Sequence, residues 1–100
     1  MSHSSEWMEL RDHLRDLRRA AELAWQRAVH HEANPDAAER HQVRVARADK
    51  VLAQLEKGLH PVCESCGERI EMDRLRADPL ESTCWSCGAR RQRAARARAA

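Results

Sequence analysis

The sequence has no phenylalanine and no tyrosine, and aromatic residues make up only 3% of it. Large aromatic side chains supply much of the area that a globular core buries, so their scarcity excludes a deep core. The length of 100 residues fits one compact domain and not two. A small domain of this kind usually needs a metal ion or disulfides in addition to its core. Because charged residues make up 34% of the chain, we expect long, solvated helices.

The sequence also lacks any long apolar run. No stretch approaches the roughly 18 consecutive apolar residues that a membrane-spanning helix needs. The N-terminal segment MSHSSEWMEL has neither the basic start nor the apolar run of a signal peptide. We therefore expect a cytoplasmic protein without a membrane partner. Since thiols stay reduced in the cytoplasm, its four cysteines are expected to bind metal rather than to form disulfides.

Two segments carry the apolar spacing of amphipathic helices. Residues 6–33 contain neither glycine nor proline, and their apolar residues recur at steps of three and four. Asn34 and Pro35 begin a second helix, 35–58, because Asn is a good N-cap and Pro suits the first helical position. Gly58 marks its expected end. The predicted seams are Trp7, Leu10, Leu14, Leu17, Ala21, Ala24 and Ala28 in the first helix, and Ala38, His41, Val45, Ala48, Leu52, Leu55 and Leu59 in the second.

The two seams face each other if the chain folds back at Asn34 and Pro35. Antiparallel pairing then brings seam positions together along both helices, from Leu10 with Leu59 to Ala28 with His41. We therefore predict an antiparallel coiled-coil hairpin over residues 1–61, with its tip near residues 33–41, in a monomeric protein. The same seams could instead serve a coiled coil between two chains, but the short connection favours the hairpin.

The four cysteines form the most specific pattern in the chain. Cys63 and Cys66 make one Cys-x-x-Cys pair, and Cys84 and Cys87 make a second pair after 17 intervening residues. Such pairs are typical of a zinc site, because each forms a tight turn whose two thiolates point the same way. Four thiolates leave no position open for water, so we predict a structural zinc ion in a module over residues 62–88. Two disulfides or a redox role for the thiols are the alternatives, and His60 could compete as a ligand.

Charge is divided unevenly along the chain, although the formal net charge is only +2. Residues 62–88 carry six acidic residues against three arginines, whereas residues 89–100 carry five arginines and no acidic residue. We expect residues 89–100 to form a short basic helix or a fraying tail. An anionic partner should therefore meet the C-terminal segment.

The motifs of the predicted zinc module resemble those of the DksA/TraR family. They are Cys-Glu-Ser-Cys-Gly-Glu-Arg-Ile at 63–70, Arg-Leu-Arg-Ala-Asp-Pro at 74–79 and Cys-Trp-Ser-Cys at 84–87. The predicted hairpin, with Asn-Pro-Asp-Ala-Ala-Glu-Arg at its turn (34–40), fits the same family. The resemblance implies a regulator that binds bacterial RNA polymerase, with the hairpin entering the secondary channel and acidic tip residues altering initiation.

Two departures from the family bear on this function. The family's tip pattern, Asp-x-x-Asp-x-Ala, corresponds here to Asp36, Glu39 and His41. Members that respond to ppGpp carry basic residues on the second arm, before the finger's proline and after its last cysteine. The matching residues are Arg47, Asp78 and Gly88, so only one of the three is basic. A carboxylate would repel a polyphosphate, and we predict that this ppGpp site is absent.

Six arginines are candidate contacts to a partner, namely Arg40, Arg44, Arg47, Arg90, Arg91 and Arg93. The alternative interpretation is a solvated helix face and a solubilising tail. Two other functions stay open: a nucleic-acid-binding zinc ribbon that uses the C-terminal arginines, and an adaptor that binds another protein through its coiled coil. The acidic finger disfavours direct nucleic-acid binding. No catalytic arrangement is visible in the sequence, and we expect no enzymatic activity.

Overall fold

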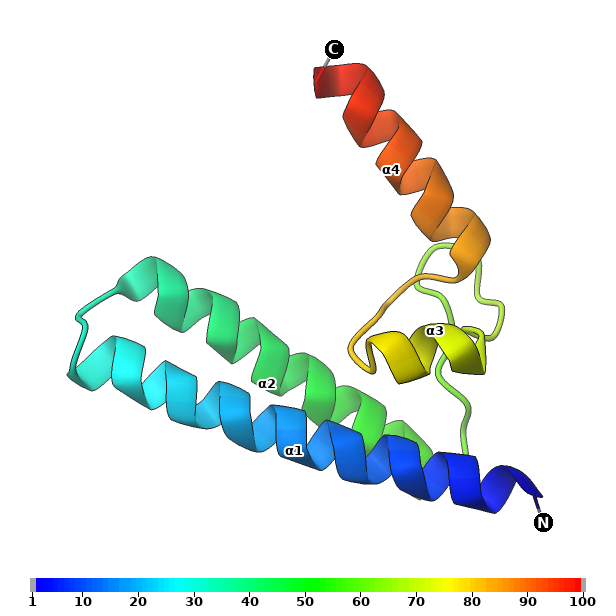
Figure 1. Ribbon diagram of the computed structural model, residues 1–100, viewed down its shortest axis with the longest axis horizontal. Helices are drawn as coiled ribbons and strands as arrows, with labels where there is room; N and C mark the ends of the chain where they lie inside the picture. The colour runs from blue at the N-terminus through cyan, green and yellow to red at the C-terminus, as the bar shows by residue number, and fades with distance from the viewer. Residues whose placement is uncertain (1, 100) are drawn as a thin grey trace. The chain divides into compact units, whose positions relative to one another are not determined.

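The computed structural model describes residues 2–99, and the side chains of residues 5–99. The described chain contains four helices (Figure 1): α1 (Ser2–His30), α2 (Pro35–Glu56), α3 (Met72–Ala77) and α4 (Trp85–Ala99). Within this part of the chain, extended pairing is limited to one antiparallel bridge between Val62 and Arg69. The chain divides into two compact units, Met1–Leu59 and His60–Ala100. The predicted fold class, a helical hairpin followed by a four-cysteine module and a C-terminal helix, is confirmed.

The first unit is an antiparallel hairpin of α1 and α2, which lie side by side along their length (Figure 1). The turn between them begins earlier than the sequence predicted, because α1 ends at His30 and not at residue 33. Ala33 closes the turn with φ +47°, a left-handed conformation that glycine usually occupies. As predicted, Asn34 caps α2: its side-chain oxygen accepts a hydrogen bond from the Ala37 N–H at 3.1 Å.

At its other end, α2 stops at a glycine, as its sequence indicated. Gly58 adopts φ +77°, and its N–H donates to the Leu55 carbonyl at 3.0 Å. The next N–H, that of Leu59, donates to the Gln54 carbonyl at 2.9 Å. This pair of bonds is the Schellman motif, in which a left-handed residue turns the chain away from the helix axis. Because Leu59 lies beyond that turn, helical spacing no longer applies to it.

The core of the hairpin follows the predicted seam with three differences. Leu10, Leu14, Ala21, Ala28, Ala38, Ala48 and Leu55 are buried as predicted. The prediction for Leu59 is wrong, because its side chain is 53% exposed at the Schellman turn. Conversely, Ala37 and Val51 are buried although they were not assigned to the seam. Val51 and Leu52 are adjacent on the inner face of α2. The buried face of an amphipathic helix is wide enough to hold two residues in one turn, so both can contact α1.

The tip of the hairpin has a small core of its own. Ala28 of α1 packs with Ala37 and Ala38 of α2, and the partly buried Trp25 packs against this cluster. One large ring thus covers a site where three alanines alone bury little area. Farther along, Arg18 of α1 donates to Asp49 of α2 and to Glu22, which links the two helices on their solvent side. None of the described helices is both long and apolar enough to cross a bilayer.

Candidate metal centre

The first Cys-x-x-Cys pair lies in a tight loop that its backbone hydrogen bonds define. The Cys63 N–H donates to the Glu68 carbonyl at 2.7 Å, and the Gly67 N–H donates to the Cys63 carbonyl at 2.9 Å. Gly67 adopts φ +77°, a left-handed conformation that is strained for any residue with a Cβ. The Ser65 N–H points at the sulfur of Cys63, 3.4 Å away. The loop therefore places both thiols near those of the second pair and supplies a donor that stabilises the Cys63 thiolate.

The second pair spans the start of a helix. Cys84 immediately precedes α4, and Cys87 lies in the first turn of that helix. The Gly88 N–H donates to the Cys84 carbonyl at 2.8 Å, which closes this turn. The Glu71 carboxylate accepts the Trp85 N–H at 3.0 Å and so caps the N-terminus of α4 from a distant point in the chain. The zinc module and the C-terminal helix consequently share Cys87, instead of meeting at residues 88 and 89.

The two loops bring the four sulfur atoms within 4.8 Å of one another, in a group that could hold a metal ion. Cys63, Cys84 and Cys87 are buried, whereas Cys66 is exposed. The sulfurs of Cys66 and Cys84 are 3.8 Å apart. A tetrahedron with zinc–sulfur bonds of about 2.3 Å has edges of about 3.8 Å, so this spacing fits a zinc ion. The donor set and its geometry thus agree with the zinc cofactor inferred from the sequence.

Without a cation, Cys63, Cys66 and Cys87 would not ionise alike. Burial disfavours the thiolate of Cys63, but backbone N–H groups from both loops outweigh it and lower its pKa to about 6. The Glu68 N–H favours the thiolate of Cys66, yet burial and the neighbouring thiols raise its pKa to about 12. Burial also raises the pKa of Cys87, against a hydrogen bond from Arg90. Four thiolates can therefore coexist here only beside a positive ion, whose binding must displace protons.

One residue that sequence reasoning missed holds the second loop in place. Arg74 of α3 donates through Nε to the Thr83 carbonyl at 2.6 Å and through Nη2 to the Thr83 hydroxyl at 3.2 Å. The same Nη2 lies 3.3 Å from a carboxylate oxygen of Glu81. The guanidinium also lies over the Trp85 ring, 4.5 Å from its centroid. The sequence did contain a signal for this role: Arg74 is part of the motif at 74–79 that supported the family resemblance, but no role was assigned to it there.

This arginine also explains why glycine follows the last cysteine. Gly88 is buried, and a Cβ at this position would overlap Nη2 of Arg74 and lie 3.2 Å from the Thr83 hydroxyl. The space beside Gly88 is thus filled by the guanidinium of Arg74 from α3. Asp78 is exposed and accepts the Leu80 N–H at 3.0 Å.

The three C-terminal arginines proposed as partner contacts fall into two groups. Arg90 donates to the sulfur of Cys87 at 3.1 Å, and Arg91 forms an ion pair with Glu64 at 2.6 Å. Arg91 therefore ties α4 to the first metal-binding loop, whereas Arg90 contacts a candidate ligand within the first turns of α4 itself. Arg93 is exposed farther along α4, without an ion pair among the described residues.

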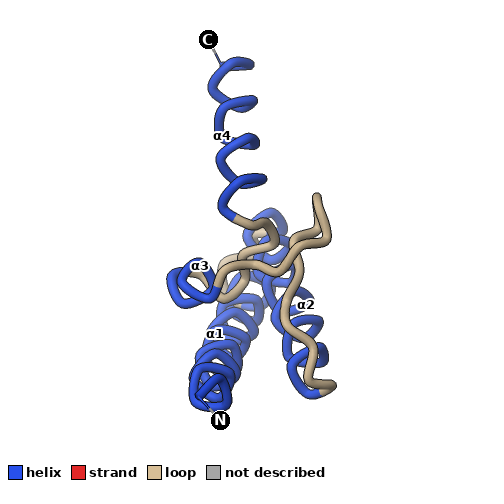
Figure 2. The backbone as a smooth tube through the Cα atoms, turned by 90° about the vertical axis from the view of Figure 1, so that its right-hand side faces the viewer, coloured by secondary structure: helices blue, strands red, loops and turns tan. Residues whose placement is uncertain are grey.

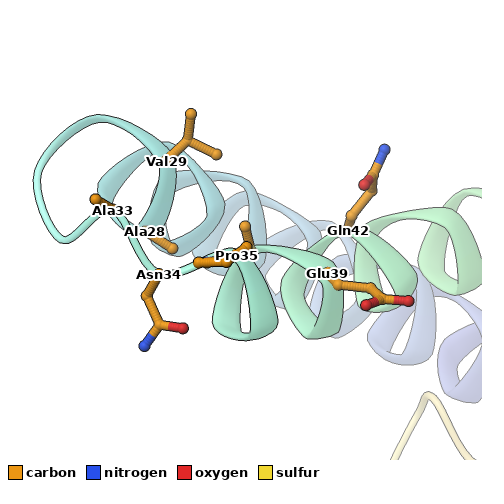
Figure 3. Close-up of a pocket in the computed structure, with 8 residues that line it drawn as sticks. Ala28, Val29, Ala33, Asn34, Pro35, Glu39 and Gln42 are labelled. Carbon is orange, nitrogen blue, oxygen red and sulfur yellow. The ribbon is translucent and has the colours of Figure 1, made fainter.

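The tip residues lie on the outer side of α2. Asp36 and Glu39 are exposed in its first turns, whereas His41 is partly buried. A hollow of about 400 Å³ lies at the tip, and its lining includes Ala28, Pro35 and Glu39. Figure 3 shows Glu39 extending beside this hollow from α2, with Asn34 and Pro35 at the turn.

The arginines of α2 extend the same surface. Asp36, Glu39, Arg40 and Arg44 surround a second hollow, with Val43 among them. Val43 is 62% exposed, so this surface offers one apolar side chain between two acids and two bases. Arg47 is partly buried one turn farther along. The structure thus brings Asp36, Glu39, Arg40 and Arg44 together on one face, while His41 lies closer to the interior of the hairpin.

A helical hairpin joined to a four-cysteine zinc finger is the class of protein that this fold and site define. Residues 58–93 match the family model of the prokaryotic DksA/TraR C4-type zinc finger. Among solved structures, the chain is similar to that of the transcription factor DksA2 from Pseudomonas aeruginosa, at 20% sequence identity and a TM-score of 0.67. The match covers 92% of this chain and 87% of the other. No curated protein matches the sequence.

The resemblance inferred from the motifs is therefore confirmed. Residues 58–93 match the model of the DksA/TraR C4-type zinc finger, and the chain as a whole shares the fold of DksA2. The match includes both Cys-x-x-Cys pairs and the motif at 74–79, whereas the tip lies outside it.

Proposed function

We propose that this protein is a cytoplasmic, monomeric, non-enzymatic regulator that binds bacterial RNA polymerase and inserts its hairpin tip into the secondary channel to modulate initiation. The observation that carries the proposal is the combination of a DksA/TraR finger with a hairpin that exposes carboxylates at its tip. The likeness to a transcription factor over 92% of the chain supports the same class of function. Within it, Cys63, Cys66, Cys84 and Cys87 hold the zinc ion.

The tip residues have the chemistry that this role requires. Asp36 and Glu39 are exposed and form no ion pair among the described residues, so their carboxylates are available to a partner. Arg40 and Arg44 on the same face offer donors to an acidic surface. A surface with both signs of charge around one apolar residue favours a protein partner, because complementary charge fixes orientation while apolar contact supplies affinity.

The proposal includes the absence of the family's ppGpp site. Asp78 places a negative charge where responsive members have a basic residue, and Gly88 has no room for any side chain. Only Arg47 keeps a positive charge among the three positions. We therefore expect the transcriptional effect to be independent of ppGpp.

Copurification with bacterial RNA polymerase tests the binding, and a photocrosslinker at position 36 should label the secondary channel. No association at micromolar concentration would refute the proposal. In vitro transcription with Asp36→Asn tests the tip: the variant should still bind polymerase but lose the effect on initiation. Asp16→Asn is the matched control, because Asp16 is also an exposed acid and lies in the middle of α1, away from the tip. Full activity of the Asp36→Asn variant would refute the role of the tip.

A further inference from the structure

The distal half of α4 is a strongly basic surface that the proposed function does not use. Residues 90–99 are exposed throughout, and Figure 2 shows α4 extending away from α3 and the finger loops. Arg93, Arg96 and Arg98 form no ion pair among the described residues, and residues 89–100 include no acid. Three unneutralised guanidinium groups on an exposed segment of helix indicate an anionic partner.

The helix is held in a fixed conformation for such a partner. Glu71 caps its N-terminus, Arg90 binds the sulfur of Cys87, and Arg91 pairs with Glu64 and donates to the Ser65 hydroxyl at 3.4 Å. Alanine, arginine and glutamine, which make up residues 89–99, all favour helix. A preformed helix loses little conformational entropy on binding, so few contacts suffice.

The spacing of the side chains indicates which anion fits. At about 100° per residue, Arg93 and Arg98 lie about 140° apart around the axis, with Ala94 and Ala97 between them. Arg96 lies on the same side of these alanines as Arg93, one turn farther along the helix. The helix therefore has a face of small residues with guanidinium groups along both edges. Such a face can enter the major groove of B-form DNA, about 12 Å wide, while its edges reach the phosphates of the two strands.

Other anionic partners fit this face less well. An acidic protein surface usually needs apolar or aromatic anchors, and residues 89–99 contain no apolar side chain larger than alanine. An anionic membrane surface requires an apolar helix face, which is likewise missing. Single-stranded nucleic acid is bound by stacking on several aromatic rings, whereas residues 60–100 contain one aromatic residue, Trp85, and one face of its ring already carries the Arg74 guanidinium. Double-stranded RNA has a major groove too narrow for a helix.

We propose that α4 binds double-stranded DNA without sequence preference, through Arg93, Arg96 and Arg98. The sequence disfavoured such binding because the finger is acidic. In the structure, however, Arg91 pairs with the Glu64 carboxylate near the start of α4, and the three distal arginines lie beyond it on an exposed helix. The interaction is independent of polymerase, so it is tested without it.

Fluorescence anisotropy of a labelled 20-base-pair DNA duplex with the full-length, zinc-loaded protein measures this binding. Three phosphate contacts predict a slope of about −2.7 for the logarithm of affinity against the logarithm of salt concentration. Binding should therefore weaken about 40-fold between 50 and 200 mM salt. The Arg93→Gln/Arg96→Gln/Arg98→Gln variant should lose measurable binding, whereas lysine at the same three positions should preserve it.

The matched control removes three exposed cations from α2, as Arg40→Gln/Arg44→Gln/Lys50→Gln, and should leave the affinity unchanged within about twofold. Equal losses in the two triple variants would overturn the proposal, because net charge alone would then account for binding. Tighter binding to polyglutamate than to the DNA duplex would overturn it in favour of an acidic protein. Equal affinity for an RNA duplex of the same sequence would exclude insertion into the major groove. No anisotropy change at 100 μM protein and 50 mM salt would refute the proposal outright.

Discussion

Replacing Gly88 by alanine should destabilise the finger, although alanine favours a helix more than glycine does. Gly88 lies in the first turns of α4, where the exchange alone should stabilise the helix by about 0.5–1 kcal/mol. The new Cβ, however, would overlap Nη2 of Arg74 and lie 3.1 Å from Cζ. The sign of the effect depends on whether the guanidinium can move without loss.

The contacts of Arg74 decide the magnitude. Its guanidinium donates twice to Thr83, pairs with Glu81 and stacks on Trp85, with only 15% of the side chain exposed. Hydrogen bonds to a charged group contribute about 1.5–3 kcal/mol, and a cation–π contact about 0.5–1 kcal/mol. Displacing the guanidinium should therefore cost about 2–4 kcal/mol. After the gain in helix propensity, Gly88→Ala should lower the free energy of unfolding by about 1–3 kcal/mol.

A double-mutant cycle tests this reasoning. Urea unfolding of the zinc-loaded protein, followed by Trp85 fluorescence in a Trp7→Phe/Trp25→Phe background, reports on the finger alone. In an Arg74→Ala background the overlap disappears, so Gly88→Ala should be neutral or stabilising by up to about 1 kcal/mol. A stabilising effect while Arg74 is present, or the same cost in both backgrounds, would show that the guanidinium does not occupy the space beside Gly88.

Three further predictions concern the hairpin and the metal. Ala33→Gly should remove the backbone strain of an alanine in the left-handed conformation and raise the stability of the hairpin by about 1 kcal/mol. Circular dichroism should show an increase in Tm of about 4–8 °C. A decrease in Tm would contradict the turn geometry. Leu14→Ala at a fully buried site should cost about 3–5 kcal/mol in denaturant unfolding, whereas Leu23→Ala at a 52% exposed site should cost under about 0.5 kcal/mol; similar costs would place the seam elsewhere. Zinc affinity, measured by competition with a chromophoric chelator, should rise between pH 6 and 8. Cys63, with a pKa near 6, is largely ionised in this range, whereas the pKa of Cys66 is raised, so zinc must displace the Cys66 proton. A zinc affinity independent of pH would exclude this proton release.

The hairpin followed from local rules in the sequence. Asn34 and Pro35 fixed the start of α2 because an N-cap and an N1 proline act on adjacent backbone groups. Gly58 fixed its end for the same kind of reason, through a left-handed turn. The prediction was wrong where it carried helical spacing past that turn to Leu59, and it missed Val51, whose burial depends on the width of the interface with α1.

The tip and the C-terminal segment required the tertiary structure. The sequence assigned His41 both to the seam of the second helix and to the tip residues with Asp36 and Glu39, and the structure decides between the two: the acids are exposed, whereas the imidazole is partly buried as a seam residue. Arg90, Arg91 and Arg93 were equivalent in the sequence. Only the structure separates Arg90 and Arg91, which contact the Cys87 sulfur and the Glu64 carboxylate, from Arg93, which has no ion pair among the described residues.

For the metal centre, the sequence by itself determined the ligands, because two Cys-x-x-Cys pairs form their loops through short-range backbone bonds that depend on few other residues. What only the tertiary structure decided is how the second loop is supported. Arg74, Thr83 and Glu81 meet there through α3, and no periodic pattern encodes a contact between residues 74 and 83. The physical reason is that a spacing rule describes neighbours within one turn or loop, whereas a guanidinium reaches partners whose positions are set by folding of the whole unit.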